Sequence, residues 1–150
     1  AVTMSHVIEH VADPVVTLRK CGELLRPGGR LVVTTPNAAS LGHRQFGRHW
    51  RGLEPPRHLR VFHPRLLASC AERAGFQVVH AGSTAANADY LVAASLSIAA
   101  ATDSDRGIGG GWDLKTAWRG VLFQYREHLA HRRDPDAGEE CVLICVKPPV

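Results

Sequence analysis

The stretch LLRPGGRLVVTTPN, residues 24–37, contains the end of a helix, a tight turn and a buried strand. Pro27 cannot continue a helix, and the glycine pair at 28–29 can adopt the positive φ that a chain reversal requires. The unbroken apolar run at 31–33 is typical of a strand covered on both faces, which predicts a central parallel strand. Ligands of parallel sheets bind at the carboxyl ends of strands, so we expect function near residues 34–37.

Further elements extend this unit in both directions. Residues 1–5 predict a strand, and a helix is predicted over 14–26 because Asp13 can accept orphan N–H groups and Pro14 suits the first helical position. Strand, helix and strand form one βαβ unit, and a second unit follows. The remaining predicted elements are a long loop (37–63), a helix (64–74), a strand (76–81), a helix (87–101), a Gly-rich linker (102–111), a helix (112–131) and a buried strand (140–146).

The helix predicted over residues 112–131 is amphipathic. Trp118, Val121, Leu122 and Tyr125 fall on one side, whereas Glu127 and several basic residues fall on the other. We expect the apolar side to need a partner surface. Candidates are the second face of the sheet, if the helix folds back, or a second copy of the chain.

Composition restricts the class of protein. The chain has 150 residues and 45% hydrophobic content, enough for one domain with one core. No apolar stretch is long enough to span a bilayer, and the four cysteines show no C-x-x-C pair, so we expect buried reduced thiols in a cytoplasmic protein. The net charge of +4 permits an anionic partner. Nucleic-acid binding is not expected, because the sequence has no stacking platform or binding motif.

Five blocks carry a resemblance to a known family. They are VTMSHVIEHVADP, LLRPGGRLVVTTPN, FGRHWRGLEPPRHLRVFHPRLL, AERAGF and ECVLICVKP, in this order. The succession resembles the C-terminal half of class I S-adenosylmethionine-dependent methyltransferases, in the branch that includes ubiquinone-biosynthesis O-methyltransferases. The resemblance implies an α/β fold, namely the later strands of a Rossmann-like seven-stranded sheet whose last strand is antiparallel. It further implies one partial domain, with 1–82 and 139–150 as sheet core and 83–138 as a helical insertion.

The resemblance also implies an activity. The family transfers a methyl group from S-adenosylmethionine, and we expect an oxygen or nitrogen of a small or lipid-linked acceptor to receive it. The family's cofactor half, with its glycine-rich loop, lies upstream of these blocks. The GIGGG at 107–111 does not replace that loop, because no strand precedes it. The alternative function is that of a non-catalytic remnant or a partner subunit. Separately, the exposed edge of the first strand would allow the chain to form a homodimer.

The first strand end holds the expected cofactor-side residues. His6, Glu9 and His10 form H-x-x-E-H, where similar enzymes often have E-x-x-E-H and some members bind a divalent ion. The resemblance assigns Met4, Ser5, His6, Glu9 and His10 to the cofactor pocket, although Met4 alternatively fills core. In the favoured interpretation, Glu9 and His10 are hydrogen-bonded parts of the cofactor pocket, so no metal is expected. In the alternative, these two and His6 hold a transition metal.

The acceptor side is expected on the segment that follows the second strand. Thr35 and Asn37 lie at the strand's carboxyl end, and the block WRGLEPPRHL resembles the one that covers the family's acceptor pocket. We therefore assign Thr35, Asn37, Trp50 and Arg57 to that pocket, and His58 as the base that takes a proton from the acceptor. The alternative is that Trp50 packs the loop and His58 hydrogen-bonds backbone.

Overall fold

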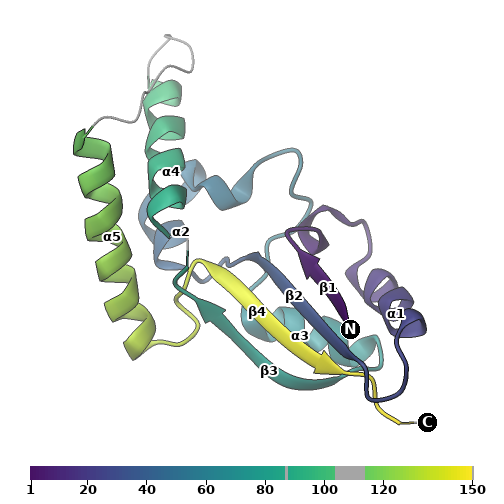
Figure 1. The fold of residues 1–150 in the computed structure, drawn as a ribbon. Coiled ribbons are helices and arrows are strands. Elements are labelled where there is room, and N and C mark those ends of the chain that lie inside the picture. Colours follow the sequence, from purple (N-terminus) through teal and green to yellow (C-terminus); the bar gives the residue numbers. More distant parts are fainter. Residues whose placement is uncertain (87, 104–113, 150) are drawn as a thin grey trace.

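The computed structural model describes residues 1–86, 88–103 and 114–149 (Figure 1). Its four strands form one mixed sheet in the order β1-β2-β4-β3. β1 pairs parallel with β2, whereas β4 is antiparallel to both of its neighbours, as the resemblance predicted for the last strand. The longer elements are β1 (Val2–Ser5), α1 (Pro14–Leu24), β2 (Arg30–Pro36), α2 (Leu41–Phe46), α3 (Pro64–Arg73), β3 (Gln77–Thr84), α4 (Ala88–Asp103), α5 (Leu114–Arg133) and β4 (Glu140–Val146).

Local signals explain the β1-α1-β2 unit. The Asp13 carboxylate accepts a hydrogen bond from the Val16 N–H at the start of α1. Gly28 has a φ of 76°, which only glycine adopts without strain, and this turn ends α1 two residues earlier than predicted. The Gly28 N–H also donates to the Lys147 carbonyl, so the turn is fastened to the end of β4.

Residues 37–63 are more ordered than the predicted loop. They contain α2 and two three-residue 3₁₀ helices, η2 (Gly47–His49) and η3 (Arg51–Leu53). The Ser40 hydroxyl accepts from the His43 N–H and starts α2, which is the N-cap signal that the prediction missed. Another 3₁₀ helix, η1 (Ile8–His10), follows β1. The predicted linker at 102–111 lies largely outside the described residues.

Within residues 1–86, 88–103 and 114–149, helices cover one face of the sheet and leave the other open. Helices α1 and α3 pack there over a core that includes Leu18, Leu31, Leu67 and Leu143, all fully or almost fully buried (Figure 1). On the opposite face, burial alternates along β2 and β4, and the side chains are only half-buried. The prediction that these strands are covered on both faces is therefore wrong for this chain. Helices α4 and α5 form a hairpin beyond the end of β3 instead of folding back over the open face.

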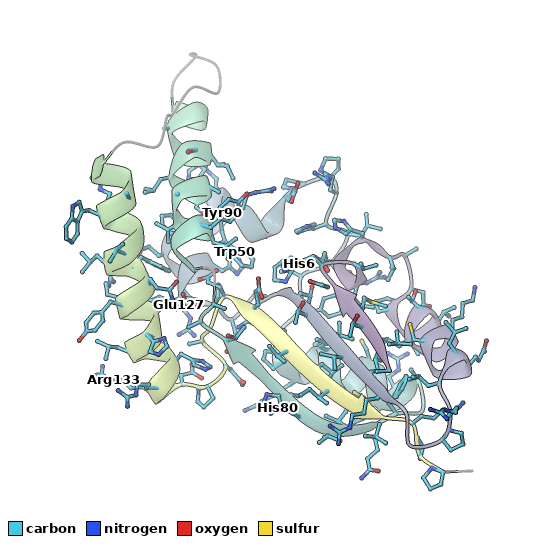
Figure 2. The ribbon with its side chains drawn as sticks, in the orientation of Figure 1. His6, Trp50, His80, Tyr90, Glu127 and Arg133 are labelled. Atoms are coloured by element: carbon cyan, nitrogen blue, oxygen red, sulfur yellow. The ribbon has the colours of Figure 1, made fainter. Side chains whose placement is uncertain are left out.

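The apolar side of α5 does not cover the sheet, the first of the two partner surfaces considered from sequence. Trp118 and Tyr125 on that side are exposed, whereas Phe123 packs on Val92 of α4 and Glu127 is buried. Figure 2 shows Glu127 on α5. The four cysteines are free and buried, as predicted. Within the described ranges, we find no helix whose length and apolar character would let it cross a membrane.

Candidate functional site

A pocket of about 450 Å³ opens at the carboxyl ends of β1 and β2. Its size is that of a small-molecule site. Figure 2 shows His6 at the end of β1 and Tyr90 at the beginning of α4, two of the residues that enclose the pocket. The lining residues come from five parts of the chain and are His6, His10, Pro36, Arg51, Gly52, Glu54, Arg57, His58, Tyr90, Leu91 and Glu140.

His6 is held between two carboxylates. Its Nδ1 lies 3.4 Å from Glu9 Oε1, and its Nε2 lies 3.1 Å from Glu140 Oε1. Hydrogen bonding to Glu140 and Glu9 raises the pKa of His6 to about 10, against the lowering effect of partial burial. His6 is therefore positively charged at neutral pH. Its φ of 50° lies in the left-handed region, so the ion pairs hold a strained backbone.

Glu9 is fully buried beneath His6. Burial would raise the pKa of this carboxyl, but hydrogen bonds from His6, the backbone and the Thr35 hydroxyl outweigh burial and lower the pKa. Thr35 Oγ1 donates to Glu9 Oε2 at 2.9 Å and is itself buried. Thr35 thus holds Glu9 from below and does not line the pocket.

His10 and His58 lie side by side, with ring centroids 4.8 Å apart. The His10 Nδ1 is 2.8 Å from the Arg57 carbonyl, and the His58 Nδ1 is 2.7 Å from the Gly52 carbonyl. Because a carbonyl only accepts, each Nδ1 carries the hydrogen and each Nε2 is left to act as an acceptor in the neutral ring. The hydrogen bond from His58 to the backbone, which was the alternative considered from sequence, is present and orients the ring.

Glu9, His10 and His58, which we call the Glu9 cluster, offer donor atoms within 4.8 Å of one another. Two imidazoles and a carboxylate form a ligand set that suits transition metals. A carbonyl on each Nδ1 is also how metal-binding histidines are oriented. The cluster differs from the set considered from sequence, since His58 joins it and His6 is engaged by Glu140.

Glu54 completes the charged wall of the pocket. Arg51 Nη1 and Arg57 Nη1 contact its two carboxylate oxygens at 2.6 and 2.7 Å, and His58 Nε2 lies 3.5 Å from Oε2. Burial would raise the pKa of Glu54, but the hydrogen bond from Arg51 and the charges of both arginines lower it. A carboxylate beside His58 stabilises the imidazolium that forms if His58 takes a proton.

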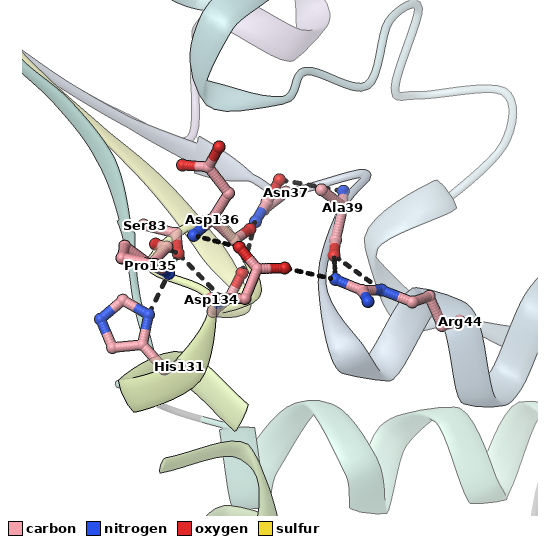
Figure 3. Close-up of polar contacts among 9 residues, drawn as sticks. Asn37, Ala39, Arg44, Ser83, His131, Asp134, Pro135 and Asp136 are labelled. Carbon is pink, nitrogen blue, oxygen red and sulfur yellow. Dashed lines mark hydrogen bonds and ion pairs between the residues drawn. The ribbon is translucent and has the colours of Figure 1, made fainter. Parts of the chain in front are cut away.

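Besides Thr35, two more residues assigned to the acceptor pocket lie outside its lining. Trp50 is buried, and its Nε1–H donates to Glu139 Oε2 at 2.9 Å. Asn37 is also buried, and its Nδ2 donates to the carbonyls of Asp136 and Gly138, both at 2.6 Å (Figure 3). Both side chains connect the segment after β2 to the start of β4. For Trp50, packing of the loop is the alternative that was considered from sequence.

The residues predicted on the cofactor side fall into three groups: core, exposed and pocket-lining. Met4 is 8% exposed and belongs to the core, the alternative considered from sequence, whereas Ser5 is exposed and its hydroxyl accepts from Thr34. His6 and His10 line the pocket. Sequence reasoning missed Glu54 and Glu140. Glu54 lies in the WRGLEPPRHL block, between two arginines, so the sequence contained a signal for it. No local pattern connects His6 with Glu140, which is 134 residues away.

A parallel βαβ unit whose sheet continues through an antiparallel last strand, with a polar pocket at the carboxyl ends, defines a class I methyltransferase fold. A family model described as "Methyltransferase domain" matches residues 1–81, more than half of the chain. The chain therefore belongs to this methyltransferase family.

Curated relatives match over a short segment. A stretch of 37 residues is 49% identical to the ubiquinone biosynthesis O-methyltransferases of Xanthomonas oryzae pv. oryzae and Parvibaculum lavamentivorans. This stretch is 25% of the chain and covers 16% and 15% of those proteins. The match is therefore local, and the chain spans only a small part of these relatives.

Solved structures match over nearly the whole chain. The (4+2)-cyclase SpnF superposes with a TM-score of 0.55 at 19% identity, covering 99% of this chain and 49% of SpnF. A S-adenosylmethionine-dependent methyltransferase of Thermotoga maritima, described as a possible histamine N-methyltransferase, gives 0.53 at 17% identity, covering 97% of this chain and 54% of that protein. At these identities the likeness establishes the fold. The chain spans about half the length of these two structures.

S-adenosylmethionine is the cofactor of this class. Two carboxylates, Glu54 and Glu140, line the cavity, but Glu54 is paired with Arg51 and Arg57, and Glu140 is paired with His6. A third carboxylate, Glu9, lies directly beneath His6. Across residues 1–86, 88–103 and 114–149, however, no glycine-rich loop leads from a strand into a helix to cradle the adenosine.

Proposed function

We propose that this chain forms the acceptor side of an enzyme that transfers a methyl group from S-adenosylmethionine to an oxygen or nitrogen of a small or lipid-linked acceptor. The cofactor-binding half of the domain would come from sequence outside these 150 residues. The match of residues 1–81 to the methyltransferase family supports the proposal most directly. The free thiols fit a cytoplasmic location, and we propose that location as well.

The pocket's residues would divide the work. When bound, S-adenosylmethionine supplies an already activated methyl group, so the protein must mainly orient the acceptor and exclude water. Arg57 and Tyr90 line the opening and would contact the acceptor. His58 Nε2 would take the acceptor's proton, and Glu54, 3.5 Å away, would stabilise the resulting imidazolium. Glu54 is thereby a positioning residue for His58.

Substitution of His58 tests this role in a complete enzyme. We expect His58→Ala to lower kcat by roughly 100-fold or more, the contribution typical of a general base, with little change in cofactor affinity. His80→Ala is the matched control, because His80 is exposed on β3 and outside the pocket. Equal losses of kcat and cofactor affinity in His58→Ala would contradict the proposal, since they would place His58 in cofactor binding or folding.

A non-catalytic role is the second candidate. The (4+2)-cyclase SpnF has this fold, so the fold by itself does not establish methyl transfer as the chemistry. Titration calorimetry on the 150-residue chain distinguishes the two cases in part. We expect no tight binding of S-adenosylmethionine by the chain alone, and restored binding once the upstream half is present. Failure of the longer protein to bind the cofactor would favour a remnant or partner subunit.

A further inference from the structure

The outer surface of α5 exposes a continuous row of large apolar side chains. Their exposed fractions run from 39% for Leu129 to 69% for Trp118. Their spacing of three, four and seven residues places them on one side of the helix, opposite the buried Phe123 and Glu127. This row, which we call the outer stripe, consists of Trp118, Val121, Leu122, Tyr125 and Leu129.

The core does not use the outer stripe. The inner side of α5 supplies the packing, because Phe123 clusters with Val92 of α4 and with Phe46 of α2. The amide of Gln124 donates to the Ala85 carbonyl from the same side. Helix α5 therefore has two apolar sides, of which only one is needed to hold it in place.

Positive charge borders the outer stripe. Arg119, Arg126 and Arg133 are seven residues apart, so they follow one edge of the stripe, and Arg132 lies on the other edge. All four are exposed, and none has a carboxylate partner within the described part of the chain. The only acidic residue of α5 is Glu127, which is buried on the inner side. The outer surface of α5 is thus apolar along its middle and purely basic at its edges.

We propose that α5 is an interfacial helix that lies flat on an anionic lipid surface. The outer stripe would enter the boundary between headgroups and acyl chains, and the arginines would contact lipid phosphates. Trp118 and Tyr125 are side chains that favour this boundary, because each has an apolar ring and a polar group. The basic edges favour this occupant over a second copy of the chain, because two identical helices facing each other would bring arginines together. This inference does not depend on the chemistry proposed for the pocket.

Vesicle co-sedimentation of the 150-residue chain tests the proposal. We expect binding to phosphatidylcholine vesicles containing about 30 mol% phosphatidylglycerol, much weaker binding to phosphatidylcholine alone, and weakening by salt. Trp118→Gln/Leu122→Gln should reduce the partition coefficient at least about 10-fold. Arg119→Gln/Arg126→Gln should remove most of the preference for anionic vesicles. The matched control is Leu24→Gln/Leu66→Gln, because these exposed leucines lie on α1 and α3.

Each of these side chains is exposed, so the variants should keep the melting temperature of the parent. Equal binding to both kinds of vesicle, or a loss in the Leu24/Leu66 control as large as that in the Trp118/Leu122 variant, would overturn the proposal. Light scattering without lipid measures whether the chain is a dimer, which is the competing hypothesis for the outer stripe. A dimer that dissociates in Trp118→Gln/Leu122→Gln would assign the outer stripe to a second copy of this chain and overturn lipid binding.

Discussion

Replacement of His6 should remove a pH-dependent part of the stability. His6→Asn deletes the charge that faces Glu9 and Glu140, while asparagine tolerates the left-handed backbone that the position requires. The raised pKa of His6, about 10, shows that the folded state holds its proton more tightly than an unfolded chain, in which the value is 6.5. His6 must therefore contribute to stability at pH values where it is protonated.

The sign and size follow from linkage. The contribution is complete below pH 6.5 and declines as the pH rises toward 10, because the unfolded state loses the proton first. Each pKa unit corresponds to about 1.36 kcal/mol, but solvent reaches the half-exposed His6 ring and screens both ion pairs. We therefore expect His6→Asn to lower the free energy of unfolding by roughly 1 to 2 kcal/mol at pH 6, and by much less at pH 9.5.

Urea unfolding at pH 5.5, 7.5 and 9.5 measures this difference directly. His80→Asn is the matched control, because it makes the same substitution at an exposed strand position and should give an offset independent of pH. His6→Gly separates charge from strain, since glycine relieves the positive φ as well. A deficit in His6→Asn that is constant from pH 5.5 to 9.5 would refute the reasoning, because the ion pairs would then add nothing that titrates.

Three further outcomes are expected. Glu127 is buried, and no side-chain or backbone group of the described residues hydrogen-bonds to its carboxylate oxygens. Burial together with the charge of Glu139 raises the pKa of Glu127 to about 8. The free energy of unfolding should therefore fall as the pH rises from 4.5 to 8, and Glu127→Gln should abolish that slope. At pH 9, urea unfolding should show the variant to be more stable than the parent by on the order of 2 kcal/mol. A Cβ on Gly42 would collide with the Glu139 carboxylate that accepts a hydrogen bond from the Gly42 N–H. Gly42→Ala should therefore lower the melting temperature and the free energy of unfolding, the latter by about 1 to 3 kcal/mol. Gly47→Ala is the control, because a Cβ there meets no atom and only the positive φ is strained. Because the charge of His6 already compensates Glu9, we expect purified protein to hold much less than one metal ion per chain by elemental analysis. A chelator should leave its melting temperature unchanged. One zinc ion per chain that is lost on substitution within the Glu9 cluster would contradict this expectation.

The elements predicted best are those whose deciding signals are local. Asp13 caps α1, Gly28 turns the chain, and β2 begins two residues later at Arg30, so three neighbouring features predict one βαβ unit. The antiparallel last strand was predicted by resemblance, and the pairing of β4 with β2 and β3 confirms it.

The rest depended on contacts that no local pattern contains. Helical periodicity shows which side chains of α5 share a side, but it does not show which side faces the protein. Glu127 was predicted on the side opposite the apolar stripe, and the structure shows that this is the side that is buried. Trp50 was assigned to the acceptor pocket because of its block, yet its partner is Glu139, 89 residues away. The roles of Met4, Ser5 and the other predicted site residues stay predictions for the experiments above.

The position of β4 has a consequence for biosynthesis. It is the last strand in the chain, yet it lies between β2 and β3, and β3 pairs with no other strand in the described residues. During translation β1 and β2 can join as soon as both have left the ribosome. β3 must wait until residues 85–139 have been made, on the order of several seconds at roughly 5–20 residues per second. Over that interval the strand edges of β2 and β3 that β4 will later pair remain exposed in the nascent chain, so a chaperone could bind them there.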